Sequence, residues 1–403
     1  MKIVHINATD ARGGAAIACT RLNEAMKLVR LQSKIVVASN VNGINHILKS
    51  IYYRLNSRRE SRLQPMANFS LMDFGMPIYH NPIVRDADLI FLHWICANSL
   101  SIKGVEKILK MGKPTFWFMH DMFPFTGGCH YALSCNGYTL RCNCCQQVGN
   151  DILKGVAEKQ LAKKIKHWAH YPNLNFIAPS SWEAKCAKMA TLCQGHEVYT
   201  VPNVLDTSLY CPLDIDAKKE FGLTLGKRTI LFGATRIQSP YKGAKYAHDC
   251  LKLLDPNLYE GLVIGRADTN FISDLPIRVV QTGFLSDDHT IAMAYNACDT
   301  FLMTSIAESF GQVVAEAMAC GKPCVSFPTG GVLDLIEHKV NGYITQNYAP
   351  AELKEGLDWV FADNERYRLL SLSARRQIEN NNSYDKVLEL HYELAPYLNE
   401  KGN

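Results

Sequence analysis

The chain has 403 residues, of which 47% are hydrophobic and 20% are charged. These are the proportions of a folded globular protein, and they exclude a largely disordered one. At about 150 residues per domain, the length favours two domains over one. The formal net charge of +5 is too small for a protein dedicated to binding nucleic acid.

The sequence begins MKIVHINATD, which enters a strand-like run and not a signal peptide. No uncharged apolar run reaches the length of about 18 residues that would predict a membrane span. We therefore expect a cytoplasmic protein, whose 14 cysteines are better interpreted as thiols or metal ligands than as disulfides. Five cysteines in apolar, helix-like contexts are expected to be inert buried thiols: Cys19, Cys186, Cys250, Cys298 and Cys320.

In the first half of the chain, short β-branched runs alternate with helical patterns, as in a parallel sheet covered by helices. Strands are predicted at 2–7, 33–39, 88–94, 114–120 and 173–180. After the first strand, Gly13 and Gly14 would allow the backbone to approach an anionic ligand closely, just before a helix pattern. A lone Gly-Gly is more often only a turn, so the interpretation depends on its place after the first strand.

Two basic stretches with aromatic residues also lie in this half, at 49–62 and 154–171. The second can form a helix with an apolar side and a lysine side that includes Lys163, Lys164 and Lys166. Such a face suits an anionic membrane surface or a polyphosphate. The alternative is an ordinary solvated helix face.

Histidines lie at the ends of two of the predicted strands, and the second of them, His120, is followed by a loop rich in proline and glycine. The same loop carries four cysteines with the spacing C-x5-C-x6-C-x2-C. Because a loop with so few core residues is stabilised by tetrahedral Zn²⁺, we expect a structural zinc site. Its ligands would be Cys129, Cys135, Cys142 and Cys145. Reduced or oxidised surface thiols are the alternative, since the spacing is not that of a standard zinc finger.

A second series of strands is predicted at 228–234, 259–265, 278–283, 299–305 and 322–327. The proline-containing segment 198–214 is the predicted junction between the two series. We therefore expect domains at 1–203 and 204–383, and a C-terminal helix at 384–403 that packs back on the first domain. Ligands of open parallel sheets bind beyond the carboxyl ends of the strands, which predicts a cleft between two facing sheets.

The loop after the strand predicted at 299–305 carries the most chemistry. Ser309 is the predicted N-cap of a helix that ends at Gly321. The helix start, with Gly311 beside it, would offer N–H groups and a positive dipole end to a diphosphate. Glu316 inside the helix would then accept hydrogen bonds from a ribose, and Glu308 would face the opposite end of the ligand. Alternatively, Glu308 is merely solvated and Glu316 lies on an exposed helix face.

The segment ESFGQVVAEAMACGKPCVSFPTGGVLDLIEHKVNGYI resembles the E-x7-E signature of retaining family-4 glycosyltransferases with the GT-B fold. GGAAIACTRL, HDMFPFTGGCHY, VPNVLD and YKGAKYA are similar to other segments of that family, so the resemblance covers almost the whole chain. It is closest to the members that build bacterial surface polysaccharides. It implies an α/β GT-B fold of two doubly wound, Rossmann-like domains facing across a cleft.

The resemblance also implies roles for the residues of the second domain. Glu316 would hold the ribose and Glu308 the hydroxyls of the donor sugar. The backbone of Ser309, Phe310 and Gly311 would bind the diphosphate.

A cationic pair is implied for the loop after the strand predicted at 228–234. Lys242 and the glycine after it match the usual Lys-Gly. Arg236 is the second candidate, although many members have Gly-Arg where this chain has Ala234 and Thr235. In members of the family that the sequence resembles, a histidine at the position of His120 contacts the donor sugar near the reacting carbon, so the resemblance implies this role for His120. The alternatives are two surface charges and a histidine that only hydrogen-bonds at a strand end.

The function that these residues imply is transfer of a sugar from a nucleotide diphosphate donor to a hydroxyl of a lipid-linked glycan, with retention of configuration. No catalytic metal and no nucleic acid is expected, and the protein would lie peripherally at the inner face of the plasma membrane. One alternative is a nucleotide-sugar epimerase or hydrolase on the same fold. Another is a zinc-bearing, basic membrane- or RNA-binding protein with a vestigial sugar site.

Overall fold

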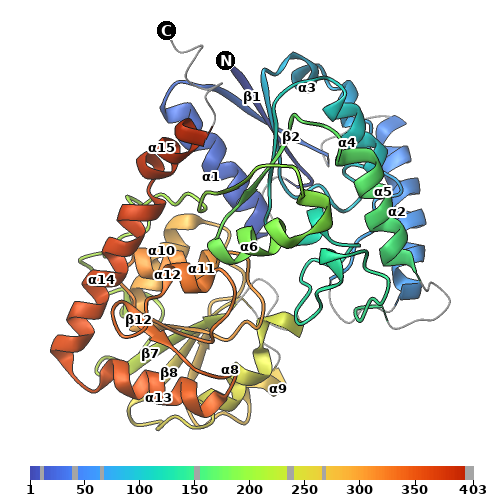
Figure 1. Ribbon diagram of the computed structural model, residues 1–403. Helices are drawn as coiled ribbons and strands as arrows, with labels where there is room; N and C mark the ends of the chain where they lie inside the picture. The colour runs from blue at the N-terminus through green and yellow to red at the C-terminus, as the bar shows by residue number, and fades with distance from the viewer. Residues whose placement is uncertain are drawn as a thin grey trace. The chain divides into compact units, whose positions relative to one another are not determined.

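The computed structural model describes residues 1–9, 13–38, 44–63, 68–148, 155–233, 240–265 and 269–394. Contacts divide the chain into two compact units, each built around its own sheet (Figure 1). The N-terminal unit contains Met1–Val204 and the residues from Val387 onward, and the C-terminal unit contains Leu205–Lys386. The last described helix, α15 (Tyr384–Leu394), crosses this division.

The N-terminal unit contains a parallel six-stranded sheet with the strand order β2-β1-β3-β4-β5-β6. Its strands are β1 (Lys2–Asn7), β2 (Gln32–Val37), β3 (Leu89–Leu92), β4 (Thr115–Phe118), β5 (Leu174–Ala178) and β6 (Val198–Thr200). Its helices are α1 (Gly14–Leu28), α2 (Ile44–Leu63), α3 (Pro82–Asp86), α4 (Ile102–Leu109), α5 (Val156–Trp168) and α6 (Ser181–Met189). Short 3₁₀ helices lie at Ile78–His80, Phe123–Phe125, Gly137–Thr139 and Thr191–Cys193. Every residue of β3 and β4 is buried, as expected for a parallel sheet covered on both faces.

The C-terminal unit contains a second parallel sheet of six strands, in the order β12-β11-β10-β7-β8-β9. Its strands are β7 (Arg228–Gly233), β8 (Tyr259–Ile264), β9 (Val279–Gln281), β10 (Thr300–Met303), β11 (Cys324–Ser326) and β12 (Gly342–Ile344). Its helices are α7 (Ala217–Glu220), α8 (Ala244–Leu251), α9 (Thr269–Ile272), α10 (Asp288–Ala297), α11 (Gln312–Ala319), α12 (Val332–Leu335), α13 (Pro350–Phe361) and α14 (Asn364–Asn382), with a 3₁₀ turn at Pro240–Lys242.

The core of the C-terminal unit lies on both faces of its sheet. Along β7, Ile230 and Phe232 belong to one buried cluster and Leu231 belongs to the other, because successive strand residues point to opposite faces. Thus the prediction of two parallel α/β sheets is confirmed. The five cysteines expected to be buried thiols are also buried. Among the described residues, no helix is both long and apolar enough to cross a membrane.

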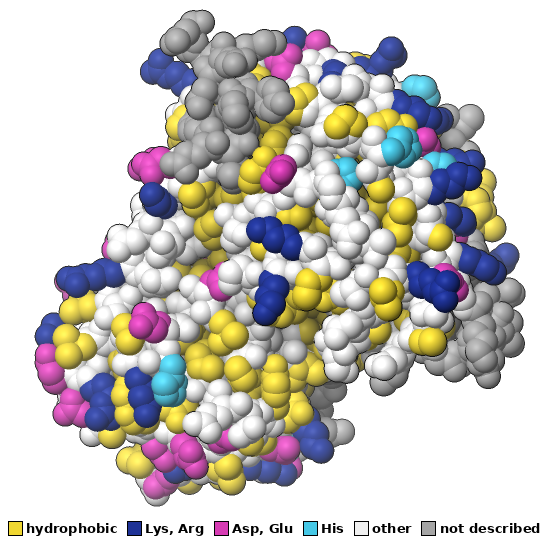
Figure 2. All heavy atoms as spheres, viewed as in Figure 1, with side chains coloured by type: hydrophobic (Ala, Val, Ile, Leu, Met, Phe, Trp, Pro, Cys, Tyr) yellow, Lys and Arg dark blue, Asp and Glu magenta, His cyan; other side chains and the backbone are white. Residues whose placement is uncertain are grey.

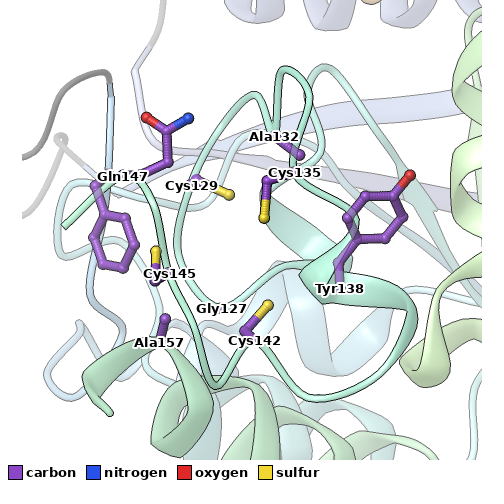
Figure 3. Close-up of a pocket in the computed structure, with 10 residues that line it drawn as sticks. Gly127, Cys129, Ala132, Cys135, Tyr138, Cys142, Cys145, Gln147 and Ala157 are labelled. Atoms are coloured by element: carbon purple, nitrogen blue, oxygen red, sulfur yellow. The ribbon is translucent and has the colours of Figure 1, made fainter. Parts of the chain in front are cut away.

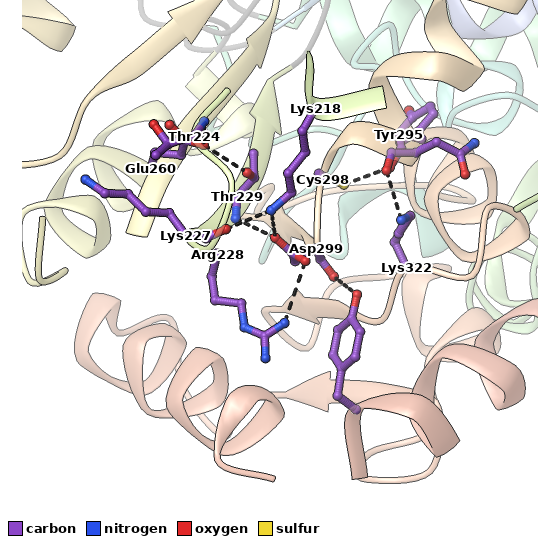
Figure 4. Close-up of polar contacts among 12 residues, drawn as sticks. Lys218, Thr224, Lys227, Arg228, Thr229, Glu260, Tyr295, Cys298, Asp299 and Lys322 are labelled. Carbon is purple, nitrogen blue, oxygen red and sulfur yellow. Dashed lines mark hydrogen bonds and ion pairs between the residues drawn. The ribbon is translucent and has the colours of Figure 1, made fainter. Parts of the chain in front are cut away.

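Asp299, which directly precedes β10, forms hydrogen bonds at the amino ends of the central strands β7 and β10 of the C-terminal unit (Figure 4). Its carboxylate accepts hydrogen bonds from the backbone N–H of Thr229 and from Nζ of Lys218, each at 2.7 Å. Its carbonyl accepts a hydrogen bond from the hydroxyl of Tyr367 at 2.9 Å. These contacts stabilise the amino ends of the strands. Parallel sheets bind their ligands at the opposite edge, beyond the carboxyl ends of the strands.

Candidate active site

Lys242 and Glu308 lie in loops that follow two paired strands, β7 and β10. The Lys242 ammonium is 3.0 Å from Oε1 and 2.9 Å from Oε2 of Glu308. The two side chains are 23% and 10% exposed, so the pair is largely withdrawn from water. The sequence resemblance assigns these side chains to different groups of a ligand, whereas in the structure they contact each other. A ligand anion at Lys242 would therefore compete with Glu308 for the ammonium.

Further hydrogen bonds to backbone carbonyls also join these loops. Thr304 donates its hydroxyl hydrogen to the carbonyl of Lys242 at 3.1 Å, and the Ile306 N–H donates to the carbonyl of Tyr241 at 2.8 Å. On the other side, the Gly331 N–H donates to the carbonyl of Glu308 at 2.9 Å. The turn that contains Gly330 and Gly331 therefore supports the Glu308 loop through a backbone hydrogen bond.

Gly243 explains why a glycine follows Lys242. It has a φ of 67° and precedes α8 as its N-cap residue. A Cβ atom there would overlap the carbonyl oxygen of Thr304. Both the left-handed conformation and the close backbone approach therefore require glycine.

We expect Gly243→Ala to lower the free energy of unfolding by about 2 kcal/mol or more, because it combines a left-handed alanine with a backbone overlap. Gly222→Ala is the matched control, since Gly222 has a φ of 63° but a Cβ there meets no atom within 4 Å. The control should lose only about 1 kcal/mol. Urea unfolding of both variants measures the difference, and equal losses would show that the Thr304 contact is unimportant.

The start of α11 differs from the sequence prediction. Ser309 is not the N-cap; that position is occupied by Gly311, whose φ of 97° turns the chain into a helix that begins at Gln312. The reason is that a left-handed glycine makes the turn, and no side chain caps the helix. Phe310 is 5% exposed and packs in the core, so only its backbone can serve a ligand. The helix ends as predicted, with Gly321 in the left-handed conformation after the C-cap.

Glu316 lies in the second turn of α11 and is 5% exposed, which rules out an exposed helix face. Its Oε2 accepts a hydrogen bond of 2.9 Å from the hydroxyl of Tyr295 on α10. Burial, together with the nearby Glu316 carboxylate, raises the pKa of Tyr295 well above its usual value, so the phenol remains a donor. No spacing in the sequence links Tyr295 to Glu316, and sequence analysis missed it.

In the N-terminal unit, Gly13 is the N-cap residue of α1, with a φ of 92°. A Cβ atom at Gly13 or Gly14 would meet no atom within 4 Å among the described residues. Packing against the described residues therefore does not account for a glycine at position 14. His120 lies two residues beyond β4, and burial lowers its pKa to about 4, although Asp121 opposes this effect.

The four cysteines of the predicted zinc site line one cavity of about 10 Å³ (Figure 3). This is room for a single small species. Cys144, which is exposed, does not line it. Within the described part of the chain, only His5, Cys19 and His93 bring three candidate ligand atoms within 4.8 Å of one another, so the loop sulfurs stand wider apart. The zinc assignment therefore stays a prediction.

Arg236 lies outside the described residues. Lys164 is not on a solvated face: it is 0% exposed, and its ammonium lies 3.7 Å from the centre of the Phe123 ring. It also donates a hydrogen bond to the carbonyl of Thr126 at 3.0 Å. Because Lys164 follows the buried Leu161 by about one helical turn, it lies on the packed side of α5. The prediction that Lys164 belongs to the solvated lysine side of this helix was therefore wrong.

Comparison with known proteins shows what the segment around this site is similar to. A sequence model of the family described as Glycosyl transferases group 1 matches residues 220–377, which contain Lys242, Glu308 and Glu316. The matched segment, which is less than half of the chain, is similar to that family. An uncharacterized glycosyltransferase of Methanocaldococcus jannaschii is 28% identical over 46% of this chain and 49% of its own length.

One curated relative matches a larger part of the chain. An Escherichia coli protein named as a colanic acid biosynthesis glycosyl transferase is 23% identical over 84% of this chain and 85% of its own length. The chain spans about half the length of the first curated relatives it matches. The fold is that of the Anabaena protein HepE, solved in complex with UDP, with a TM-score of 0.66 and 20% identity over 99% of this chain and 100% of HepE. Such structural neighbours are GT-B glycosyltransferases, which confirms the GT-B fold.

Proposed function

We propose that the protein is a retaining family-4 glycosyltransferase that transfers a sugar from a nucleotide diphosphate sugar to a hydroxyl of a lipid-linked glycan in polysaccharide biosynthesis. The observation that carries the proposal is the Lys242–Glu308 pair, which lies in loops after paired strands within the group 1 segment. That segment also contains the uncapped start of α11 and Glu316 in its second turn.

The donor diphosphate binds at the start of α11 and at Lys242, where N–H groups and the ammonium offer positive charge. Glu316 accepts hydrogen bonds from the ribose, and Glu308 accepts them from the donor sugar once the diphosphate shares its lysine. From the N-terminal unit we assign Gly13, Gly14 and His120 to substrate binding, and from the loop after β7 also Arg236.

In the reaction, the bond between the anomeric carbon and the diphosphate oxygen breaks as the acceptor oxygen bonds to the same face of that carbon. The acceptor proton passes to the leaving diphosphate, which ends with the bonding electron pair. Negative charge on the diphosphate therefore grows in the transition state, and Lys242 and the helix start stabilise it more strongly than in the ground state. No catalytic metal is part of this mechanism.

A thermal-shift comparison of UDP-, GDP-, ADP- and dTDP-sugars tests donor binding, because a ligand of the folded state raises its apparent stability. We expect a UDP-sugar to give the largest shift, since HepE has been solved with UDP and with UDP-glucose. Product analysis with a lipid-linked glycan acceptor then tests transfer. An epimerised or hydrolysed donor without acceptor dependence would favour the alternative enzyme, and no shift with any donor would contradict the proposal.

We expect Tyr295→Phe to weaken binding of free UDP about 2- to 10-fold, because Glu316 loses one hydrogen bond that orients it. Tyr259→Phe is the matched control, since Tyr259 also contacts a carboxylate, that of Asp358 at 3.4 Å, but on β8. Isothermal titration calorimetry measures both. If Glu316→Gln weakens binding of free UDP but Tyr295→Phe leaves it unchanged, Tyr295 does not position the carboxylate.

We propose that exposed lysines of the N-terminal unit bring the enzyme to an anionic membrane. Lys159 and Lys166 are exposed on α5, whereas Lys163 pairs with Asp73 at 2.7 Å. Figure 2 shows lysine and arginine side chains along the edge of this unit formed by α4 and α5, mixed with histidine and apolar side chains. At about 1 kcal/mol for each lysine near the surface, a few lysines suffice for reversible attachment.

Replacing Lys159 and Lys166 with Glu should lower sedimentation with phosphatidylserine vesicles about tenfold at low salt, and leave donor binding intact. The control replaces Lys185 and Lys188, two exposed lysines of α6, and changes the net charge equally. An equal loss in the control would reduce the effect to net charge alone.

We also propose that Cys129, Cys135, Cys142 and Cys145 bind one structural zinc ion. The Cys135 sulfur accepts a hydrogen bond from the Gly137 N–H at 3.4 Å. Burial raises the pKa of Cys145, and hydrogen bonds from the backbone of Gln147 and Val148 oppose this. Backbone N–H groups directed at sulfur favour the thiolates that zinc requires, and zinc–sulfur bonds of about 2.3 Å would draw the four sulfurs inward.

A further inference from the structure

Three histidines from adjacent strands of the N-terminal unit form a continuous chain of hydrogen bonds. Nδ1 of His5 is 2.9 Å from Nε2 of His93, and Nδ1 of His93 is 2.9 Å from Nε2 of His120. His5 lies within β1, His93 directly follows β3, and His120 follows β4. Because β1, β3 and β4 are neighbours in the sheet, this chain of hydrogen bonds runs across the sheet and toward the carboxyl ends of the strands.

The inner end of this chain is anchored by two polar side chains. Nε2 of His5 is 3.0 Å from the hydroxyl of Ser33, and that hydroxyl donates to Oδ1 of Asn23 at 2.9 Å. His5, His93, Ser33 and Asn23 are each less than 5% exposed. A chain so well buried keeps its hydrogen bonds, since breaking one would leave a polar group unsatisfied.

The anchor determines where each proton lies. Because the Ser33 hydroxyl hydrogen is donated to Asn23, its oxygen must accept the Nε2 proton of His5. A neutral imidazole has one donor and one acceptor, so Nδ1 of His5 accepts from His93, and Nδ1 of His93 accepts from His120. This leaves His120 with its proton on Nε2 and a lone pair on Nδ1.

We propose that His5 and His93, anchored by Ser33 and Asn23, are positioning residues that hold His120 in its Nε2–H tautomer and so present Nδ1 as a hydrogen-bond acceptor to a substrate hydroxyl. The substrate part of this inference rests on the proposed function, whereas the tautomer does not. A phosphate oxygen only accepts hydrogen bonds, so Nδ1 in this state cannot serve the diphosphate. The partner of His120 is therefore a hydroxyl of the donor sugar or of the acceptor.

Several features of His120 agree with this role. Its side chain is only partly buried, and no described residue makes a hydrogen bond to its Nδ1. Burial lowers its pKa to about 4, so the ring is neutral near pH 7 and the Nδ1 lone pair stays available. The chain of hydrogen bonds ends on its inner side at Asn23, whose amide does not titrate. The hydrogen bonds therefore orient His120 but do not carry its proton away.

The same region offers a competing interpretation, because the ligand atoms of His5, Cys19 and His93 lie within 4.8 Å of one another. A metal ion there would have to lie between Nδ1 of His5 and Nε2 of His93, which are at direct hydrogen-bond distance. Elemental analysis of the purified protein distinguishes the two. A metal that is retained in the wild type and lost in Cys19→Ser would overturn the hydrogen-bonded chain.

The tautomer is measured directly by two-dimensional ¹⁵N–¹H NMR of the protein labelled in histidine, near pH 7. The His120 signals are assigned by their loss in His120→Ala. We expect the proton on Nε2; a proton on Nδ1 would overturn the proposal, because the chain would then run in the opposite direction. This result stands even if the protein transfers no sugar.

Ser33→Ala tests whether the chain, and not the immediate surroundings of His120, sets the tautomer. The variant should show a mixture of tautomers at His120, and Ser33→Thr, which keeps the hydroxyl, should restore one. In the transferase assay, Ser33→Ala should lower kcat about 2- to 10-fold with little change in the donor KM. An unchanged tautomer in Ser33→Ala would contradict the proposed control of His120.

Discussion

Lys242→Ala should lower kcat on the order of 10²-fold or more, the loss expected when one preorganised positive group is removed from a developing negative charge. The donor KM should change much less, because the charge on the diphosphate grows only as the glycosidic bond breaks. Steady-state kinetics with the donor identified by thermal shift measures both values. The matched control is Lys245→Ala, an exposed lysine on α8 three residues further on.

The contact between Lys242 and Glu308 means that Lys242→Ala changes the surroundings of two side chains. Removing the ammonium leaves the Glu308 carboxylate, whose side chain is only 10% exposed, without a cation at 2.9 Å. Part of any loss in Lys242→Ala could therefore come from a displaced Glu308. A double-mutant cycle with Glu308→Gln separates the effects, since a direct role in the transition state predicts that Lys242→Ala still lowers kcat in the Glu308→Gln background. A change in KM alone would make Lys242 a ground-state binder.

Cys142→Ser should abolish zinc binding, whereas Cys144→Ser should retain it. Cys142 and Cys145 keep the two-residue gap that lets one turn present two thiolates to an ion, and both line the cavity, unlike Cys144. Elemental analysis of protein purified without added metal should give close to one zinc per chain for the wild type and for Cys144→Ser. Cys142→Ser should also lose several kcal/mol of stability, because the binding free energy of a structural zinc is folding free energy.

The zinc prediction has two clear ways to fail. A metal-free wild type with full activity would show that the cavity holds no ion that matters. Zinc that is lost in Cys144→Ser and kept in Cys142→Ser would show a different ligand set. Cys250→Ser, in a buried thiol of the other unit, controls for the general cost of adding a hydroxyl to a packed site.

The strand pattern was predictable because it is local. Runs such as 2–7 and 228–233 are apolar and β-branched over several residues, and the structure has strands there, as predicted. The strands β6 and β12 were missed, and β6 lies within the segment 198–214 that the sequence analysis assigned to the junction between the two series. Their pairing with β5 and β11 is decided by tertiary packing.

At the candidate site, the sequence by itself determined which residue types were present and in what order: a lysine before glycine, two glutamates eight residues apart, and four spaced cysteines. Tertiary structure alone decided what each one contacts. It pairs Lys242 with Glu308, gives Glu316 the hydroxyl of Tyr295, and buries Lys164. The physical reason is that hydrogen bonds and ion pairs depend on distances of about 3 Å between atoms that can be far apart in the chain, and only the packing of strands and helices sets those distances.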